Sequence, residues 1–207
     1  MGSSFRLPRV YPITDTQISG LSHAEQVALF ADAGATVVQL RDKHALALQF
    51  YEQARAALEV ARRRGVQLII NDRVDIALAI GATGVHLGQD DLPPEAARRL
   101  LGDGVVIGFS THNLTQAIEA STWPVDYLAI GPIFQTSTKE NPDPVVGLEG
   151  LRSVREAIGE RPLVGIGGIT PANAREVIEA GADSVAMISG LLARPELIST
   201  NLRSLLD

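Results

Sequence analysis

The chain has 207 residues, a formal net charge of -6 at pH 7 and no cysteine. The length suits a single domain, the acidic balance argues against a nucleic-acid partner or an anionic membrane surface, and the missing thiols exclude disulfides and thiolate metal sites. Hydrophobic residues make up 45% of the chain but aromatic residues only 4%. Aliphatic side chains must therefore fill most of the core, as they do in parallel barrels.

The first residues, Met1 to Arg6, contain no apolar segment of the kind that secretion signals carry. No apolar run elsewhere reaches the length that spans a membrane. We therefore expect a cytoplasmic protein that does not use a membrane.

Short apolar runs rich in β-branched residues alternate with helical patterns along the chain. Strands are predicted at Val10–Ile13, Thr36–Leu40, Val66–Ile70, Gly84–Leu87, Val105–Phe109, Tyr127–Ile130, Leu163–Ile166 and Ser184–Ile188. Helical patterns include Ala24–Ala33, Leu48–Arg64, Pro94–Leu101 and Ala172–Ala180. This alternation favours parallel βαβ units that close into a (β/α)8 TIM barrel, with residues 1–207 as one catalytic domain. A doubly wound open sheet is the competing architecture.

Glycine follows several helical patterns directly before a strand, as at Gly34, Gly81 and Gly181. Glycine past a helix end is the favoured left-handed cap. These positions lie at the amino ends of the strands, the face of a barrel that serves stability. Functional groups are therefore expected at the carboxyl ends.

An amide and two cations follow the second predicted strand, in Gln39, Arg41 and Lys43. Side chains alternate along an extended strand, so these three share one face. They would converge on one anionic ligand, whereas an exposed charged loop is the structural alternative.

Carboxylates follow the third and fourth strands, in Asn71-Asp72 and Asp90-Asp91. Carboxylates at adjacent strand ends suit Mg²⁺, which takes one or two of them together with substrate phosphates and water. Each pair also has a structural interpretation, because one member is equally suited to cap a helix or hold a turn.

Phosphate donors are predicted after the fifth and sixth strands. Ser110 is either such a donor or a helix cap. The long non-periodic stretch from Gly131 to Gly147 contains Thr136-Ser137-Thr138-Lys139. This cluster of hydroxyls and a cation predicts a phosphate-binding lid, unless the stretch is disordered.

Glycines and hydroxyls follow the last two strands. Gly165-Ile166-Gly167-Gly168 exposes backbone N–H groups. Thr170 and Pro171 are predicted as the N-cap and first residue of the next helix, and Ser189 follows the eighth strand. Barrels often build a phosphate site from these two loops.

The histidines point less clearly to function. His23 and His44 lie in polar segments and are expected to be solvated, whereas His86 lies within a strand and is expected to be a hydrogen-bonded core residue. His112 follows a strand and is a candidate for substrate contact. No serine lies in a nucleophile-elbow sequence, so no nucleophilic triad is predicted.

These segments resemble the thiamine-phosphate synthase family from Tyr11 to Ser189. The most specific are Gln39-Leu40-Arg41-Asp42-Lys43, Asn71-Asp72, His86-Leu87-Gly88-Gln89-Asp90-Asp91, Thr136-Ser137-Thr138-Lys139 and Gly165-Ile166-Gly167-Gly168-Ile169-Thr170. Their order and placement at strand ends carry the resemblance. It implies an Mg²⁺-dependent enzyme that joins an aminopyrimidine diphosphate to a thiazole phosphate or its carboxylated form, and it suggests a homodimer.

The resemblance also implies a role for each matched position. The metal ligands would be Asp72 and Asp91. The pyrimidine diphosphate would be bound by Gln39, Arg41, Lys43, Asn71, Ser110 and Lys139, and Leu40 and Asp42 would also be substrate-binding residues. The thiazole phosphate would be bound by Thr136, Ser137, Thr138, Gly168, Ile188 and Ser189. The candidate catalytic groups are Arg41, Lys43, Ser110 and Lys139.

In the family reaction the thiazole nitrogen replaces diphosphate on the pyrimidine methylene. Positive charge must stabilise the leaving group, and a dissociative route through a methylene cation needs no protein nucleophile. A thiazole tautomerase with His112 as acid and base, or a non-catalytic ligand-binding relative, would also suit this barrel. The combination of Asp72, Asp91, Lys43 and Lys139 argues against both.

Overall fold

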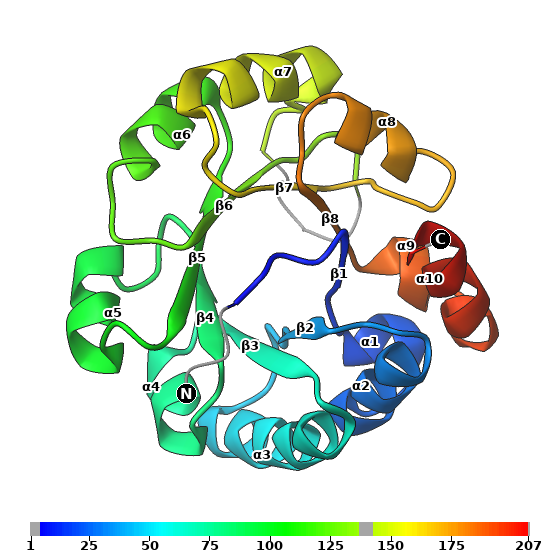
Figure 1. Cartoon of the computed structure of the whole chain (residues 1–207). Coiled ribbons are helices and arrows are strands. Elements are labelled where there is room, and N and C mark those ends of the chain that lie inside the picture. The colour runs from blue at the N-terminus through cyan, green and yellow to red at the C-terminus, as the bar shows by residue number, and fades with distance from the viewer. Residues whose placement is uncertain (1–4, 137–142, 207) are drawn as a thin grey trace.

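Eight parallel strands form the centre of the computed structural model, which describes residues 5–136 and 143–206 (Figure 1). The strands are β1 (Val10–Pro12), β2 (Val37–Leu40), β3 (Gln67–Asn71), β4 (Gly84–Leu87), β5 (Val106–Thr111), β6 (Tyr127–Ile130), β7 (Leu163–Ile166) and β8 (Ser184–Met187). Their order is β1-β8-β7-β6-β5-β4-β3-β2, and each neighbouring pair is parallel.

The two ends of this sheet meet just beyond β1. A parallel bridge joins Ile13 to Gln39, and the Thr14 N–H donates to the Gln39 carbonyl at 2.9 Å. The sheet is therefore closed, which confirms the predicted barrel and makes the open-sheet alternative wrong.

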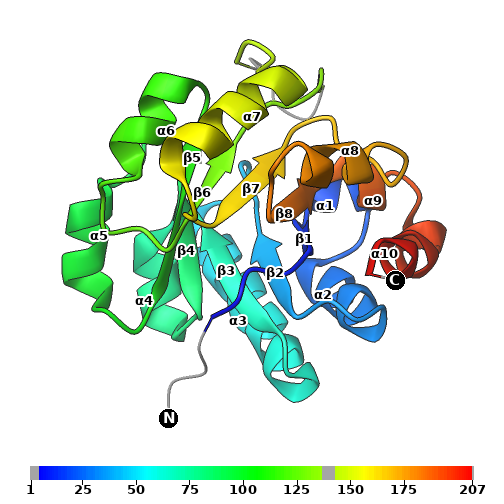
Figure 2. The ribbon, with the colours of Figure 1, turned by 45° about the horizontal axis from the view of Figure 1, so that its top comes forward.

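Helices surround the barrel (Figures 1 and 2). They are α1 (Thr16–Ser19), α2 (His23–Asp32), α3 (Ala47–Arg64), α4 (Val74–Ile80), α5 (Pro94–Leu101), α6 (Leu114–Ala120), α7 (Gly147–Ile158), α8 (Ala174–Glu179), α9 (Ser189–Leu192) and α10 (Ile198–Leu206), with a 3-10 helix, η1 (Pro195–Leu197). The start of α2 has a full capping box between Ser22 and Glu25. None of the helices in the described residues is long and apolar enough to cross a membrane.

Two predicted boundaries differ from the structure by two residues or more. The fifth strand continues to Thr111, so Ser110 lies within the strand, and Asn113 caps the helix that follows. Helix α8 begins at Ala174, so the prediction that Thr170 and Pro171 start this helix was wrong. The reason is a local turn in which the Asn173 side chain accepts a hydrogen bond from the Thr170 N–H at 2.8 Å.

The core has two layers because side chains alternate along each strand. Residues such as Val38 and Leu40 face the helices, whereas Tyr11, Ile69 and Tyr127 lie inside the barrel. Phe5 stacks on Tyr127 with ring centroids 5.9 Å apart, and the segment that carries it crosses the barrel in Figure 1. The interior is thus filled near its amino end, which leaves the carboxyl end for a ligand.

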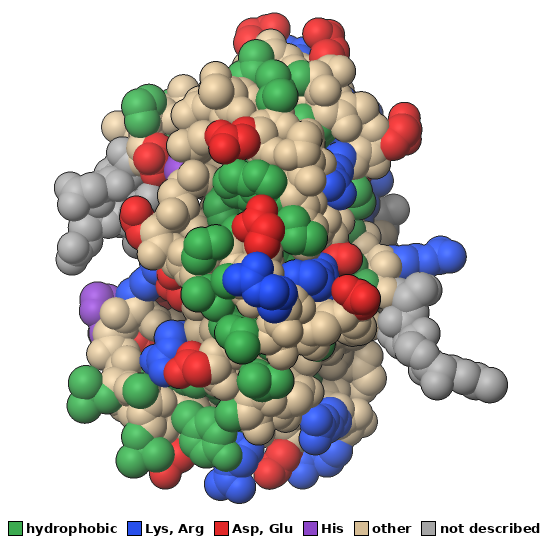
Figure 3. Space-filling view, turned by 90° about the vertical axis from the view of Figure 1, so that its left-hand side faces the viewer, with side chains coloured by type: hydrophobic (Ala, Val, Ile, Leu, Met, Phe, Trp, Pro, Cys, Tyr) green, Lys and Arg blue, Asp and Glu red, His purple; other side chains and the backbone are tan. Residues whose placement is uncertain are grey.

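The outer surface mixes charged and hydrophobic side chains. Figure 3 shows this on the side of the molecule that lies at the left in Figure 1, where α5 is labelled. Exposed hydrophobic residues of the neighbouring helices include Leu78 of α4, Leu100 of α5 and Ile118 of α6. Single exposed residues of this kind are common on monomers and oligomers alike, so the homodimer stays a prediction.

Candidate active site

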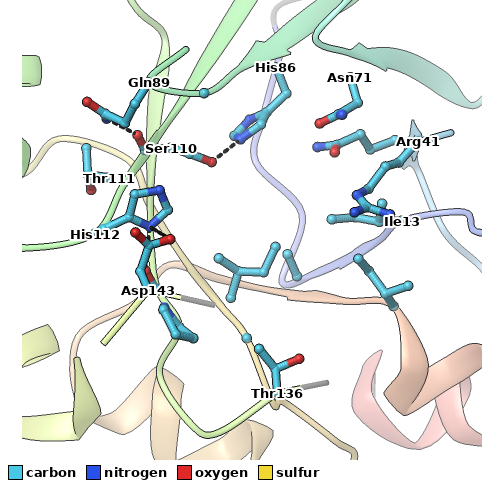
Figure 4. Close-up of a pocket in the computed structure, with 18 of the residues that line it drawn as sticks. Ile13, Arg41, Asn71, His86, Gln89, Ser110, Thr111, His112, Thr136 and Asp143 are labelled. Atoms are coloured by element: carbon cyan, nitrogen blue, oxygen red, sulfur yellow. Dashed lines mark hydrogen bonds and ion pairs between the residues drawn. The ribbon is translucent and has the colours of Figure 1, made fainter. Parts of the chain in front are cut away.

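A cavity of about 490 Å³ opens at the carboxyl ends of the strands (Figure 4). Most of the sequence-predicted site residues in the described part of the chain line it. They are Gln39, Arg41, Lys43, Asn71, Asp72, Asp91, Ser110, Thr136, Gly168, Ile188 and Ser189. Ser137, Thr138 and Lys139 lie outside the described residues.

Leu40 and Asp42 are placed differently from their neighbours in the same segment. Leu40 is fully buried in the layer between strands and helices. The Asp42 carboxylate accepts hydrogen bonds from the His44 and Ala45 N–H groups, each at 2.9 Å. Neither side chain lines the cavity, because alternation turns both away while Arg41 and Lys43 face it.

The two cations after β2 are already paired with carboxylates. The Lys43 Nζ lies 2.5 Å from the Asp72 Oδ2, and an Arg41 guanidinium nitrogen donates to the Asp15 Oδ2 at 3.1 Å. Lys43 is half exposed, with 48% of its side chain accessible. Such an exposed pair contributes little to stability, so Lys43 can exchange its partner for a bound anion at small cost.

Asp72 and Asp91 form the carboxylate pair of the cavity. Asp72 has a left-handed backbone, with φ of 63°, and the N-cap of α4 is Arg73, so neither Asn71 nor Asp72 caps that helix. The Asp91 Oδ2 holds a turn by accepting from the Gly88 N–H at 2.7 Å. Burial raises the pKa of the Asp91 carboxyl above its usual range, and the nearby Asp72 carboxylate adds to this.

The donor set fits a hard divalent cation. Two adjacent carboxylates that raise each other's cost of ionisation are stabilised when a cation sits between them. Within residues 5–136 and 143–206, no group of three His, Cys, Asp or Glu side chains is suited to a metal. A metal here would therefore need oxygens from its ligand, which is how Mg²⁺ commonly binds with phosphates.

A line of hydrogen bonds crosses the barrel beneath the cavity. The Gln39 Nε2 donates to the Tyr11 hydroxyl at 3.2 Å, the Tyr11 and Tyr127 hydroxyls lie 3.0 Å apart, and the Tyr127 hydroxyl lies 3.0 Å from the His86 Nδ1. The His86 Nε2 reaches the Ser110 Oγ at 2.8 Å, as the dashed line in Figure 4 shows.

Burial within the barrel decides the protonation state of His86. Burial lowers the pKa of the His86 imidazole from 6.5 to about 4, so the ring is neutral at pH 7. His86 is a buried, hydrogen-bonded residue, as predicted, but it also lines the cavity. Ser110 is held by the histidine and not by a helix cap.

Loops after β6, β7 and β8 form the other half of the cavity. Gly168 has φ of 66°, and a Cβ there would lie 2.5 Å from the Gln135 carbonyl oxygen. Only glycine suits this position, because both the backbone conformation and the close approach exclude a side chain. The wall formed by Thr136, Gly168 and Ser189 carries no charge of its own.

The other histidines have contrasting environments. His112 lines the cavity, and its Nδ1 lies 2.8 Å from the Gly131 carbonyl and 3.4 Å from the Asp143 carboxylate. His44 is exposed, as predicted. The prediction that His23 is solvated was wrong, since only 1% of this residue is accessible. Its polar sequence neighbours conceal a position that packs on Phe50.

Tyr11 and Tyr127 are site residues that sequence reasoning missed. Each lies on a strand at a position that faces the barrel interior, and alternation with the helix-facing residues was the available signal. What no pattern indicated is that their hydroxyls join Gln39 to His86 across the barrel.

Comparison with known proteins agrees with this geometry. Residues 10–191 match the sequence model of the thiamine monophosphate synthase family. A thiamine-phosphate synthase of Koribacter versatilis is 49% identical over 204 residues, covering 94% of each chain. One of Chloroflexus aurantiacus is 47% identical over 190 residues, covering 91% of this chain and 87% of the relative.

The fold has the same relatives. The structure of a thiamine phosphate pyrophosphorylase from Pyrococcus furiosus superposes with a TM-score of 0.85 at 36% identity, covering 95% of this chain and 93% of that one. The family match covers most of the chain, and the two relatives are 47% and 49% identical to it over 91% and 94% of its length. The chain belongs to the thiamine monophosphate synthase family.

Proposed function

We propose that this protein joins an aminopyrimidine carrying a methylene diphosphate to a thiazole phosphate, releasing diphosphate, with Mg²⁺ bound by Asp72 and Asp91. Thiamine phosphate synthesis is the activity of its family. The observation that carries the site assignment is the asymmetry of the cavity. One half holds Lys43 and Arg41 with the carboxylates of Asp72, Asp90 and Asp91, and the other holds hydroxyl groups, glycine backbone and the single carboxylate of Asp143.

The charged half suits the diphosphate. Departure of diphosphate builds negative charge, which cations already in place stabilise without reorganisation. Arg41 and Lys43 reach the cavity from one loop, and Lys43 now neutralises Asp72. When bound between Asp72 and Asp91, Mg²⁺ would neutralise diphosphate oxygens. Lys43 is then available to donate to the leaving group.

The network inside the barrel supports Ser110 as a further donor. An amide nitrogen only donates, so Gln39 supplies the first proton to the Tyr11 oxygen. If each hydroxyl donates its hydrogen bond in the same direction, Tyr127 donates to His86 Nδ1 and His86 Nε2–H donates to Ser110. The Ser110 hydroxyl is then available to donate a hydrogen bond to an anionic ligand.

The half without cations suits the smaller, monophosphate substrate. Backbone N–H groups near Gly168 and the hydroxyls of Thr136 and Ser189 line it, and such donors bind a phosphate group without a metal. The predicted roles of Ser137, Thr138 and Lys139 belong to the same proposal. The reaction then depends on holding both substrates in reacting geometry, with no nucleophile from the protein.

The test follows diphosphate release from the purified chain with both substrates while Mg²⁺ is titrated. Asp72→Asn is expected to abolish release at every Mg²⁺ concentration. Asp75→Asn is the matched control, because the Asp75 carboxylate pairs with Arg73 and does not line the cavity. Full activity of Asp72→Asn would overturn the metal assignment.

The same assay separates the competing activities. Wild-type protein that forms no product with Mg²⁺ present contradicts the synthase proposal. Isomerisation of the thiazole substrate without metal would identify a tautomerase that uses His112. Substrate binding without turnover would identify a non-catalytic relative.

A further inference from the structure

Three polar side chains lie buried directly behind the loop that carries Arg41 and Lys43. They are Thr14, which is fully buried, His23, the first residue of α2 with 1% accessible, and Asp42, whose side chain is 8% accessible. None of the three lines the cavity. Nothing in the reaction proposed above uses them, yet burying polar groups is costly unless they are hydrogen-bonded.

Thr14 and His23 connect this cluster to the backbone of Arg41. The Arg41 N–H donates to the Thr14 Oγ1 at 3.3 Å, and the Thr14 Oγ1 lies 2.7 Å from the His23 Nδ1. Because Thr14 accepts from Arg41, its one hydroxyl proton is available for His23 Nδ1. The ring proton of His23 is then on Nε2.

The Nε2 of His23 faces the carboxylate between the two cations. It lies 3.6 Å from the Asp42 Oδ2 and has no closer hydrogen-bond partner in the described part of the chain. The other Asp42 oxygen, Oδ1, accepts from the two N–H groups that follow Lys43 in the loop. The histidine therefore supports the same carboxylate that shapes the turn.

Alternation explains why this matters for the cavity. Asp42 points back toward His23, and this direction sends the flanking Arg41 and Lys43 side chains toward the ligand. Helix α2 braces the arginine a second time. Its Gln26 side chain accepts from the Asp15 N–H at 3.0 Å, and Asp15 pairs with the Arg41 guanidinium.

We propose that His23 is a positioning residue that sets the direction of Arg41 and Lys43 toward the diphosphate of the substrate. This inference rests on the proposed function for the identity of the substrate. The histidine acts through Thr14 and Asp42 and does not touch the ligand.

The variants are chosen to separate positioning from folding. His23→Phe keeps a ring against Phe50 but removes both polar contacts. His23→Gln keeps a donor that can reach Asp42. His44→Gln is the matched control. This exposed histidine lies in the loop that carries Arg41 and Lys43, and its side chain does not line the cavity.

Two measurements are made on each variant. The first is the KM for the pyrimidine diphosphate against that for the thiazole phosphate. We expect His23→Phe to raise the KM for the pyrimidine diphosphate about tenfold, the effect of about one lost hydrogen bond, with the KM for the thiazole phosphate unchanged. His23→Gln should recover part of the loss, and His44→Gln should match the wild type.

The second measurement is calorimetric binding of inorganic diphosphate with Mg²⁺, which requires no turnover. It should weaken in His23→Phe by a similar factor. If the wild type forms no thiamine phosphate, the proposed function fails while this binding comparison still tests the positioning role.

Equal diphosphate binding by folded His23→Phe and wild type would overturn the inference, as would equal increases of both KM values. Should His23→Phe fail to fold, Thr14→Val removes the linking hydroxyl at nearly constant volume. It is then expected to weaken diphosphate binding, and unchanged binding would equally overturn the proposal.

Discussion

Acidification should destabilise this protein through His86 in particular. Burial lowers the pKa of this imidazole to about 4, whereas the unfolded chain titrates it near 6.5. Above pH 6.5 the ring is neutral in both states and contributes no pH dependence. As the pH falls from 6.5 toward 4, the unfolded chain takes up a proton that the folded barrel excludes, so the free energy of unfolding decreases.

The size of the effect follows from the two pKa values. Proton linkage for a single group shifted from 6.5 to about 4 predicts a loss of about 2 kcal/mol between about pH 7.5 and about pH 5. Burial also lowers the pKa of His23, which adds a loss of the same sign. A variant is therefore needed to isolate the contribution of His86.

His86→Gln provides this comparison, because Gln keeps a donor that can reach Ser110 but does not titrate. Urea unfolding, followed by the fluorescence of Trp123, would be measured at several pH values in both proteins. The variant is expected to be less stable at pH 7.5 and to lose about 2 kcal/mol less than the wild type on acidification. Parallel stability profiles over this range would refute the assignment of a neutral, buried His86.

Three further substitutions test the packing of the barrel and of the site. Tyr127→Phe removes the hydroxyl between Tyr11 and His86, and unfolding in urea should show a loss of about 1–3 kcal/mol. Gly84→Ala places a Cβ 2.5 Å from the Val106 carbonyl oxygen, so the thermal midpoint should fall by several degrees. Gly168→Ala adds a side chain where φ is 66°. Steady-state kinetics should show that this variant raises the KM for the thiazole phosphate more than the KM for the pyrimidine diphosphate.

Each substitution has a control of the same type. Tyr51→Phe alters a tyrosine outside the network, Gly104→Ala meets no atom within 4 Å, and Gly147→Ala has φ of 70° without any close neighbour. Equal effects of a test variant and its control would show that the network, the strand contact or the loop contact is not the cause.

Much of the fold was readable from local pattern. Short β-branched runs predicted all eight strands, seven of the eight to within one residue at both ends, because a strand buried on both faces is apolar almost throughout. The same periodicity placed Gln39, Arg41 and Lys43 on one face. Carboxyl ends of parallel strands meet at one end of a barrel, so Asp72, Asp91 and these cations converge there.

Other features depended on the tertiary structure. The sequence allowed Ser110 either to cap a helix or to bind a ligand, whereas in the structure β5 continues through Ser110 and His86 holds its hydroxyl. His23 was expected to be solvated, because its sequence neighbours are polar, yet it is buried against Phe50.

The chain by itself determined which residues face inward at each strand end, because that follows from alternation along one strand. Only the closed barrel decided which of them are partners. Tyr11, Tyr127 and His86 are joined across the interior although Tyr11 and Tyr127 are 116 residues apart in sequence. Hydrogen bonds and burial are properties of that packing, so the neutral state of His86 and the support of Arg41 by Thr14 could not be read from local sequence.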